Sequence, residues 1–176
     1  MNASFVPRTI LITGATGGIG SALAEIYAGP GTTLLLQGRN EQRLAEVANR
    51  CEQGGARVLT HALDVRDQEA LVRRVREWSA REDIDLAIPA AGVNANIGPR
   101  REGESWGEIS ALIEINVLAA MAVVDAVLPS MRARRRGQIA LFSSLAAYYG
   151  LPLTPSYCAS KAAIKAYGEA LRGWLA

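Results

Sequence analysis

Residues 13–20 read Thr-Gly-Ala-Thr-Gly-Gly-Ile-Gly, and this stretch decides how the chain folds. It follows the short apolar run 9–13, which predicts a buried strand, and it opens a segment with Ile19, Leu23 and Ile26 on one helical face. Glycines let a backbone turn sharply and approach a phosphate closely, and the N–H groups of the following helix then face the negative charge. A glycine-rich turn alone is common, so its position between a strand and a helix is what favours a dinucleotide-binding site.

The rest of the chain repeats this alternation of short apolar runs and segments of helical period. Further strands are predicted over 32–37, 57–63, 84–88 and 138–143, a long helical region over 105–135, and a final helix from Ser156. Parallel strands need right-handed crossovers, and helices supply them. The sequence therefore predicts an α/β fold, a Rossmann-type doubly wound parallel sheet, in a single domain over residues 1–176.

Composition and charge narrow the range of partners. Hydrophobic residues make up 49% of the chain and charged residues 20%, and the formal net charge is only +2. So small a charge gives no reason to expect nucleic acid or an acidic membrane as partner, and Asp125 interrupts the longest apolar stretch. Cys51 and Cys158 are too few for a disulfide framework. We therefore expect a cytoplasmic protein without a metal site, whose partner is a small molecule.

The glycine spacing Gly-x-x-x-Gly-x-Gly resembles the turn of the classical short-chain dehydrogenase/reductase family, and the resemblance continues along the chain. It implies cofactor contacts from the turn and from later strand ends, at Gly14, Thr16, Gly17, Gly18, Ile19, Gly20, Asp64, Val65, Ala90, Ala91 and Gly92. Asp64 and Val65 match the family's adenine clamp, although an aspartate that ends a strand more often caps a turn. Pro89 and Ala90 stand where the family has two asparagines, so any support that those amides give the sheet is absent.

A second set of residues points to hydride-transfer chemistry. Tyr157 and Lys161 lie four residues apart at the start of the last helix and so share one of its faces. An ammonium lowers the pKa of a neighbouring phenol, which suits a group that exchanges a proton with a reacting oxygen. Such a pair is common by chance and is often only a surface pair. Ser144, thirteen residues before Tyr157 at a strand end, makes the active-site interpretation the stronger one.

The family resemblance implies a catalytic set of Asn116, Ser144, Tyr157 and Lys161. In that set Tyr157 is the acid/base, Ser144 holds the substrate oxygen, and Lys161 also binds the nicotinamide ribose. Asn116 is implied to hold a water beside Lys161 as a proton relay. The neighbouring Ser143 fits the alternative role, a serine that satisfies a turn, better than Ser144 does.

The end of the second strand bears on the choice of nicotinamide cofactor. Relatives specific for NAD place an acid there to hold the ribose hydroxyls, whereas this chain has Gly38 followed by Arg39. A guanidinium can grip the 2′-phosphate of NADP, so NADP(H) is preferred and NAD(H) stays open as the alternative. Many NADP(H) relatives carry a second basic residue where this chain has Gly17, and Arg39 can instead stack on adenine.

Family members continue beyond the last helix into further strands and a loop that closes over the substrate, so the chain is C-terminally short of the usual family length. Two hypotheses follow. The protein is an oxidoreductase acting on a carbonyl or secondary alcohol, or it is a truncated or non-catalytic nucleotide-binding or interaction module with the same fold. The resemblance also implies a homodimer or homotetramer formed through the long helical region and the Tyr157 helix, whose small residues are Ala159, Ala162, Ala163, Ala166 and Ala170.

Two loops that leave the carboxyl ends of strands are the guide to the substrate. Residues 145–154 and 93–99 supply apolar and aromatic side chains and no cluster of Lys or Arg. They predict an uncharged or mildly polar carbonyl compound. Equally, Tyr148 and Tyr149 can simply pack beneath the family's closing loop. The identity of the substrate and the direction of the reaction are left open.

Overall fold

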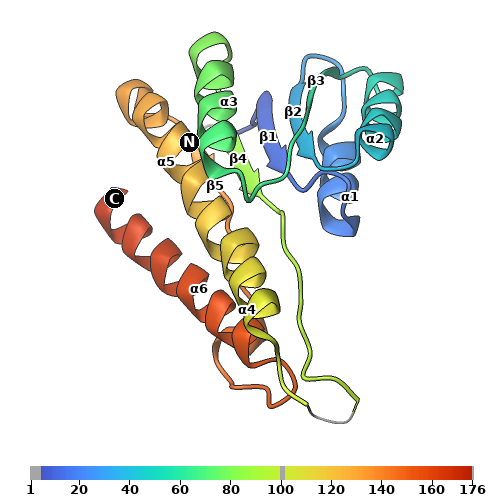
Figure 1. The fold of residues 1–176 in the computed structure, drawn as a ribbon. Helices are drawn as coiled ribbons and strands as arrows, with labels where there is room; N and C mark the ends of the chain where they lie inside the picture. Colours follow the sequence, from blue (N-terminus) through green and yellow to red (C-terminus); the bar gives the residue numbers. More distant parts are fainter. Residues whose placement is uncertain (1–4, 100–101, 176) are drawn as a thin grey trace.

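The computed structural model describes residues 5–99 and 102–175 and contains one sheet of parallel strands (Figure 1). The strands are β1 Thr9–Thr13, β2 Thr33–Gly38, β3 Arg57–Ala62, β4 Leu86–Pro89 and β5 Gln138–Ile139. Their order is β3-β2-β1-β4-β5, and every neighbouring pair is parallel. The chain therefore leaves β1 toward one side of the sheet and returns to its other side at β4, which creates the crevice where open α/β sheets bind ligands. The doubly wound parallel sheet predicted from the sequence is confirmed.

Helices cover both faces of the sheet. They are α1 Gly18–Tyr27, α2 Glu41–Gln53, α3 Gln68–Arg81, α4 Trp106–Ile113, α5 Ala119–Arg134 and α6 Pro155–Leu175. Figure 1 shows α1 and α2 on one side of the strands and α3, α5 and α6 on the other. Within β1, Leu11 belongs to the core shared with α3 and α5, whereas Ile10 and Ile12 belong to the core shared with α1 and α2. This alternation is what a sheet covered on both faces requires.

Helix α1 buries its small residues most deeply, and only part of the apolar face that the sequence pattern suggested packs against the core. Gly20 and Ala24 are its buried positions, whereas Ile19 and Ile26 are 59% and 75% exposed. A Cβ at position 20 would lie 2.3 Å from the carbonyl oxygen of Gly14, so the helix starts too close to the turn to tolerate a side chain there. Of the predicted face, Leu23 packs against the core that α1 shares with α2, whereas Ile19 and Ile26 are exposed, so the prediction is confirmed only in part.

Strand β5 is shorter than the predicted 138–143. Its ladder with β4 contains Gln138 and Ile139, and the Ala140 N–H donates to the Ala87 carbonyl at 2.9 Å. In this register the next hydrogen bond from β4 would come from the amide at position 89, and Pro89 has no N–H to donate. The proline that stands where the family has an asparagine therefore shortens the pairing.

The predicted helical region 105–135 is continuous but not uniformly α-helical. Between α4 and α5, residues Glu114–Leu118 form a π-helical turn, a rare feature that often occurs at functional sites. An 18-residue window within Trp106–Arg134 has a mean hydropathy of 2.1, so by length and composition alone this region could cross a membrane, despite Asp125. Because 56% of that window is buried inside the protein, its apolarity has the pattern of a core helix.

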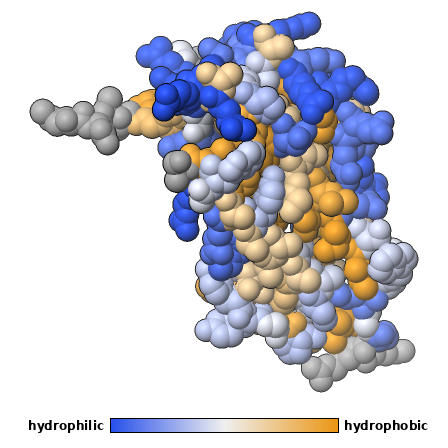
Figure 2. Space-filling model, turned by 90° about the vertical axis from the view of Figure 1, so that its left-hand side faces the viewer, coloured by the Kyte–Doolittle hydropathy of each residue, from blue (hydrophilic) through white to orange (hydrophobic). Residues whose placement is uncertain are grey.

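The C-terminal helix presents small residues to the surface. Ala159, Ala162, Ala166 and Ala170 of α6 are exposed and spaced so that they share one face. Figure 2 shows a band of apolar residues on the side of the molecule where α5 and α6 lie. The subunit contact expected through these helices stays a prediction.

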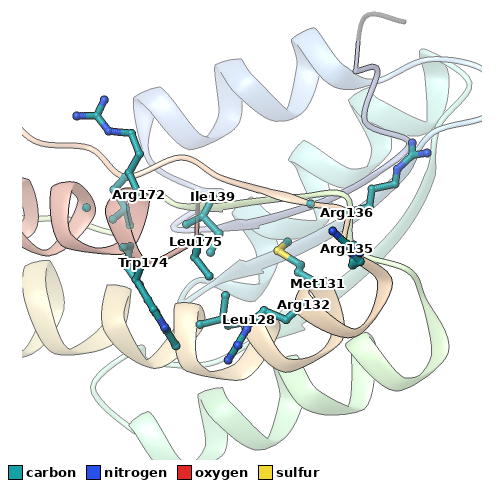
Figure 3. Close-up of a pocket in the computed structure, with 13 residues that line it drawn as sticks. Leu128, Met131, Arg132, Arg135, Arg136, Ile139, Arg172, Trp174 and Leu175 are labelled. Carbon is teal, nitrogen blue, oxygen red and sulfur yellow. The ribbon is translucent and has the colours of Figure 1, made fainter. Parts of the chain in front are cut away.

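A groove of about 940 Å³ lies between the end of α5, β5 and the end of α6 (Figure 3). Apolar side chains such as Met131 and Ile139 line it together with four arginines. Within the described ranges, β5 pairs only with β4, so this groove flanks an open edge of the sheet.

Candidate active site

Two adjoining cavities open along the carboxyl ends of the central strands. The first, of about 270 Å³, is lined by the glycine turn and by the ends of β2 and β3, and we call it the turn cavity. The second, of about 260 Å³, is lined by Asn116, Tyr157 and Lys161 among others, and we call it the tyrosine cavity. Residues 90–93 line both cavities, so the two adjoin along this segment, and we refer to the two together as the groove. This places the predicted Ala90, Ala91 and Gly92 where the two ends meet.

The glycine turn wraps closely around the end of β4. Gly14 has a φ of +68°, a left-handed conformation that favours glycine, and a Cβ there would lie 2.6 Å from the Ala91 Cα. The Gly17 N–H donates to the Gly14 carbonyl at 2.9 Å and closes the turn. The predicted turn residues that line the turn cavity are Gly14, Thr16 and Gly17. Ile19 lines the tyrosine cavity. Gly18 and Gly20, at the start of α1, lie outside both linings.

The end of β2 and the first turn of α2 bring one arginine each to the turn cavity. Gly38, Arg39 and Arg43 all line it, and the Arg43 N–H donates to the Asn40 side chain at 2.8 Å in the first turn of α2. A Cβ at position 38 would lie 2.8 Å from the Cγ2 atom of Thr16, so an acidic side chain there would require Thr16 to move. Arg43 was not predicted, because only the first turn of α2 returns this position to the cavity.

Asp64 and Val65 line the turn cavity as predicted sites, and the Asp64 carboxylate is held by Arg66. The Arg66 guanidinium donates to both carboxylate oxygens, the shortest bond being 2.7 Å, and the Arg66 N–H donates at 3.0 Å. These hydrogen bonds hold the pKa of the Asp64 carboxyl below its usual value. The carboxylate is therefore ionised and oriented by a residue that was not predicted.

Tyr157 and Lys161 face the tyrosine cavity from the first turns of α6. Lys161 Nζ lies 5.5 Å from the centroid of the Tyr157 ring and donates to the Phe142 carbonyl at 2.9 Å. Lys161 is only 9% exposed, and burial lowers its pKa. The Ser143 hydroxyl donates to the Lys161 carbonyl at 2.9 Å, so the segment after β5 and the helix hold each other.

Asn116 lies in the π-helical turn, is 3% exposed and lines the tyrosine cavity. Its Oδ1 accepts from the Val93 N–H at 2.8 Å, while its Nδ2 donates to the Val93 carbonyl at 2.9 Å and to Ser160 Oγ at 3.1 Å. Ser160 in turn donates to the Tyr157 carbonyl at 2.8 Å. The amide thus joins the segment after β4 to the helix that carries the tyrosine. Its role as the holder of a relay water stays a prediction.

Ser144 is the predicted catalytic residue that lies outside the lining of the tyrosine cavity. Its Oγ accepts a hydrogen bond from the Ala146 N–H at 3.2 Å and caps the short 3-10 turn Leu145–Ala147. The turn-satisfying role expected of Ser143 therefore belongs to Ser144, while Ser143 binds the Lys161 carbonyl. Successive side chains of an extended segment point in opposite directions. Ser143 and Ser144 therefore reach different partners, and the turn-capping role expected of the first is taken by the second.

A carboxylate that was not predicted holds the start of α6. Glu104 Oε2 accepts from the Ser156 N–H at 3.0 Å, and its Oε1 accepts from the Ser156 hydroxyl at 2.9 Å. Negative charge is favourable at a helix N-terminus, and Ser156 directly precedes Tyr157. The Ile97 N–H also donates to the Leu153 carbonyl at 3.1 Å. The loop before α4 is therefore fastened to the loop before α6.

The sheet order, the glycine turn at its crevice and the adjoining cavities define a dinucleotide-binding α/β domain. The family model for short chain dehydrogenases matches residues 8–176, and the chain belongs to that family.

Comparison with known proteins agrees with this assignment. An uncharacterized oxidoreductase of Myxococcus xanthus (strain DK1622) is 35% identical over 166 residues, which cover 94% of this chain and 65% of that protein. A short-chain dehydrogenase from Sphingobium yanoikuyae, solved in complex with NADPH, has a TM-score of 0.85 and 30% identity and covers 96% of this chain and 66% of its own. An NAD⁺-bound xylitol dehydrogenase has a TM-score of 0.87 and 29% identity, over 96% and 65%. The chain thus spans about two thirds of the length of these relatives.

Proposed function

We propose that this protein is an oxidoreductase that transfers a hydride between NADP(H) and a carbonyl compound or the corresponding secondary alcohol. The observation that carries the proposal is the pair of adjoining cavities that share residues 90–93, one lined by the glycine turn and the other by Tyr157 and Lys161. Hydride transfer to a carbonyl carbon requires a proton donor at the neighbouring oxygen, and this groove offers a cofactor seat and a phenol side by side. The similarity to proteins bound to NADPH and NAD⁺ supports the choice of a nicotinamide cofactor.

The residues around the groove fit a dinucleotide. Gly14 and Gly17 present backbone rather than side chains to the turn cavity, and α1 begins directly after them, so its first N–H groups can bind a pyrophosphate. The ionised Asp64 carboxylate and Val65 would hold the adenine. Gly92, which has no side chain, would lie beside the cofactor where the two cavities meet. When bound, the nicotinamide supplies or accepts the hydride.

Three side chains of this chain serve the substrate oxygen and its proton. Tyr157 donates its phenolic proton to the oxygen during reduction and takes it back during oxidation. The Lys161 ammonium stabilises the phenolate and would bind the nicotinamide ribose. The Ser144 oxygen accepts a hydrogen bond from the Ala146 N–H, which leaves its own O–H free to donate. This hydroxyl would donate to the substrate oxygen and so position it.

The preference for NADP(H) follows from the end of β2. Thr16 occupies the space beside Gly38 that an acid for the ribose hydroxyls would need. Arg39 and Arg43 bring two positive charges to the same cavity. These guanidinium groups would pair with the 2′-phosphate, which NADH lacks.

Fluorescence titrations with NADPH and NADH test this preference. We expect NADPH to bind at least about tenfold more tightly, and Arg39→Ala or Arg43→Ala to remove most of the difference, because hydrogen bonds to a charged group are lost. Arg50→Ala is the matched control, since Arg50 also lies on α2 but pairs with Glu25 of α1. Equal affinities of the two cofactors for the unaltered chain would contradict the preference.

For the substrate we propose an uncharged or mildly polar carbonyl compound. The loop after β5 exposes large apolar and aromatic side chains, Leu145 at 81%, Tyr148 at 65% and Tyr149 at 74%. A panel of ketones, aldehydes and secondary alcohols, followed through the absorbance of NADPH, tests the reaction. A preference for phosphate-bearing substrates would contradict this class of substrate. Binding of NADPH without turnover of any of these compounds would instead favour a non-catalytic module.

A further inference from the structure

Gln37 is a polar side chain in an otherwise apolar, buried strand. It follows Leu34, Leu35 and Leu36 in β2 and is 1% exposed. A buried amide costs free energy unless both its oxygen and its NH₂ group are hydrogen-bonded. Its partners therefore indicate what the amide does.

The two ends of the Gln37 amide reach different loops. Oε1 accepts from the Gly14 N–H at 3.1 Å, and Nε2 donates to the Leu63 carbonyl. The main chain reinforces both connections, because the Gln37 carbonyl accepts from the Ala15 N–H at 2.9 Å and the Leu63 N–H donates to the Gly38 carbonyl at 3.1 Å. One residue of β2 thus joins the loop that follows β1 to the loop that follows β3.

Each of these loops carries part of the turn cavity. Gly14 opens the glycine turn in its left-handed conformation, and Leu63 directly precedes Asp64 and Val65. Gln37 itself lines the cavity together with Gly14 and Asp64. The amide therefore lies between the loop proposed to bind phosphate and the loop proposed to bind adenine, whose separation must suit a single dinucleotide.

We propose that Gln37 is a positioning residue for the cofactor, which fixes the glycine turn and the Asp64 loop as one preorganised site. Like the proposed function on which it rests, this role assumes that a dinucleotide binds along the groove. The role requires an amide: glutamate would accept from the Gly14 N–H but could not donate to the Leu63 carbonyl, and methionine would leave both backbone groups unpaired. A site that is already ordered loses less conformational entropy when its ligand binds.

Titration of NADPH into the unaltered chain and the variants Gln37→Glu and Gln37→Met tests this role, at a temperature where circular dichroism shows all three folded. We expect NADPH to bind about tenfold more weakly to each variant, because a hydrogen bond that orders a binding loop is lost. Leu34→Ala is the matched control. It removes a fully buried side chain from the same strand and destabilises the fold, but its side chain belongs to the core beneath α1 and α2. The NADPH dissociation constant of this control stays close to that of the unaltered chain.

A purely structural role for Gln37 gives a different result, in which the variants are less stable but bind NADPH as tightly as the unaltered chain. That outcome overturns the positioning role and leaves the proposed function standing. Failure of the unaltered chain to bind NADPH overturns both. A double-mutant cycle adds a further readout: Gln37→Met weakens NADPH binding less in an Asp64→Ala background than alone, because the loop that it positions no longer supplies the carboxylate. Fully additive effects contradict the positioning of that loop.

If the variants do not fold, hydrogen exchange in the unaltered chain decides the question. Slow exchange of the Gly14 amide without NADPH supports a turn that is already fixed by Gln37. An amide that becomes protected only after NADPH is added shows that the turn is not preorganised, and this result overturns the proposal.

Discussion

The turn cavity and the tyrosine cavity are held together by different kinds of contact. Around the turn cavity, loops that follow neighbouring strands are joined by the buried amide of Gln37 and by main-chain hydrogen bonds between those strands. Around the tyrosine cavity, single side chains, chiefly those of Asn116, Lys161 and Glu104, connect helices to the loops that follow or precede other elements. The first cavity is therefore a property of the sheet itself, whereas the second depends on where α6 docks.

This difference separates cofactor binding from chemistry. A substitution in the turn cavity should change the affinity for NADPH, while a substitution in the tyrosine cavity should change turnover or the docking of α6. Lys161 is the exception, because it would also bind the nicotinamide ribose. Substitutions at the two ends then test whether the groove consists of two independent halves.

The substitution expected to separate turnover from NADPH binding most clearly is Tyr157→Phe, which removes one oxygen from the tyrosine cavity and leaves the turn cavity unchanged. We expect turnover to fall by about 100-fold or more, the usual contribution of a general acid, with unchanged NADPH affinity. Steady-state rates on the best substrate of the panel and NADPH titrations measure the two quantities. Tyr167→Phe is the control, because Tyr167 lies on the same helix outside the cavity lining. Retained turnover with weakened NADPH binding would contradict the separation of roles.

Much of the sheet was predictable because buried parallel strands are continuous apolar runs. β1 has the predicted bounds, and β2, β3 and β4 differ from them by two residues at most. The end of β5 was not predictable from its own residues, because Pro89 in the neighbouring strand removes the donor that would extend it. The burial of Gly20 in α1 was missed for a similar reason, since the closeness of the Gly14 carbonyl leaves no room for a side chain at that position.

The site residues likewise divide into those that the pattern of one element predicts and those that depend on contacts between elements. Tyr157, Lys161 and the glycine turn were predictable because their spacing within one element carries the chemistry. Their supporting partners were not, because a contact such as that of Glu104 joins residues 52 positions apart and exists only once the fold has formed. Ser144 shows the limit of a one-dimensional pattern, since it caps the turn expected of its neighbour.

A smaller effect is expected from Glu104→Ala, which releases the start of α6 from the loop before α4. Two hydrogen bonds to a carboxylate at a helix N-terminus are lost, so the free energy of unfolding should fall by about 1–2 kcal/mol. We expect kcat to fall as well, because Tyr157 becomes less firmly placed, and NADPH affinity to change little. Chemical denaturation and steady-state kinetics measure these quantities.

The matched control for Glu104 is Glu169→Ala on α6, the helix whose start Glu104 holds. Glu169 pairs with Lys165 at 2.7 Å on the surface, and an exposed pair of this kind is worth little. If the two substitutions lowered stability equally, the contact between Glu104 and Ser156 would not be what fastens the helix.

The smallest effect concerns the pH dependence of stability, and Lys161 in the tyrosine cavity is the group to examine. Burial holds the pKa of Lys161 below its ordinary value of 10.5. Between that lowered pKa and 10.5 the unfolded chain binds more protons than the folded chain, so this lysine makes the free energy of unfolding rise with pH across that window. Lys161→Met removes the titrating group and with it this part of the rise. The difference in stability between the unaltered chain and Lys161→Met should therefore shift in favour of the unaltered chain as the pH approaches 10.5.

Lys165→Met is the control for this measurement, because Lys165 lies one turn further along α6 and its pKa is shifted in the opposite direction. Its hydrogen bond to Glu169 raises its pKa above 10.5, so its contribution to stability is complete below 10.5 and is lost only as the pH rises through the raised value. The stability difference between the unaltered chain and Lys165→Met should accordingly stay constant across the window in which Lys161 acts. Denaturation curves recorded in steps from neutral pH to 10.5 give both differences, and the titration of groups distant from the substituted lysine cancels from each. A flat difference for Lys161→Met would show that the ammonium is solvated in the folded chain, and the tyrosine cavity would then be open to water at its lysine end.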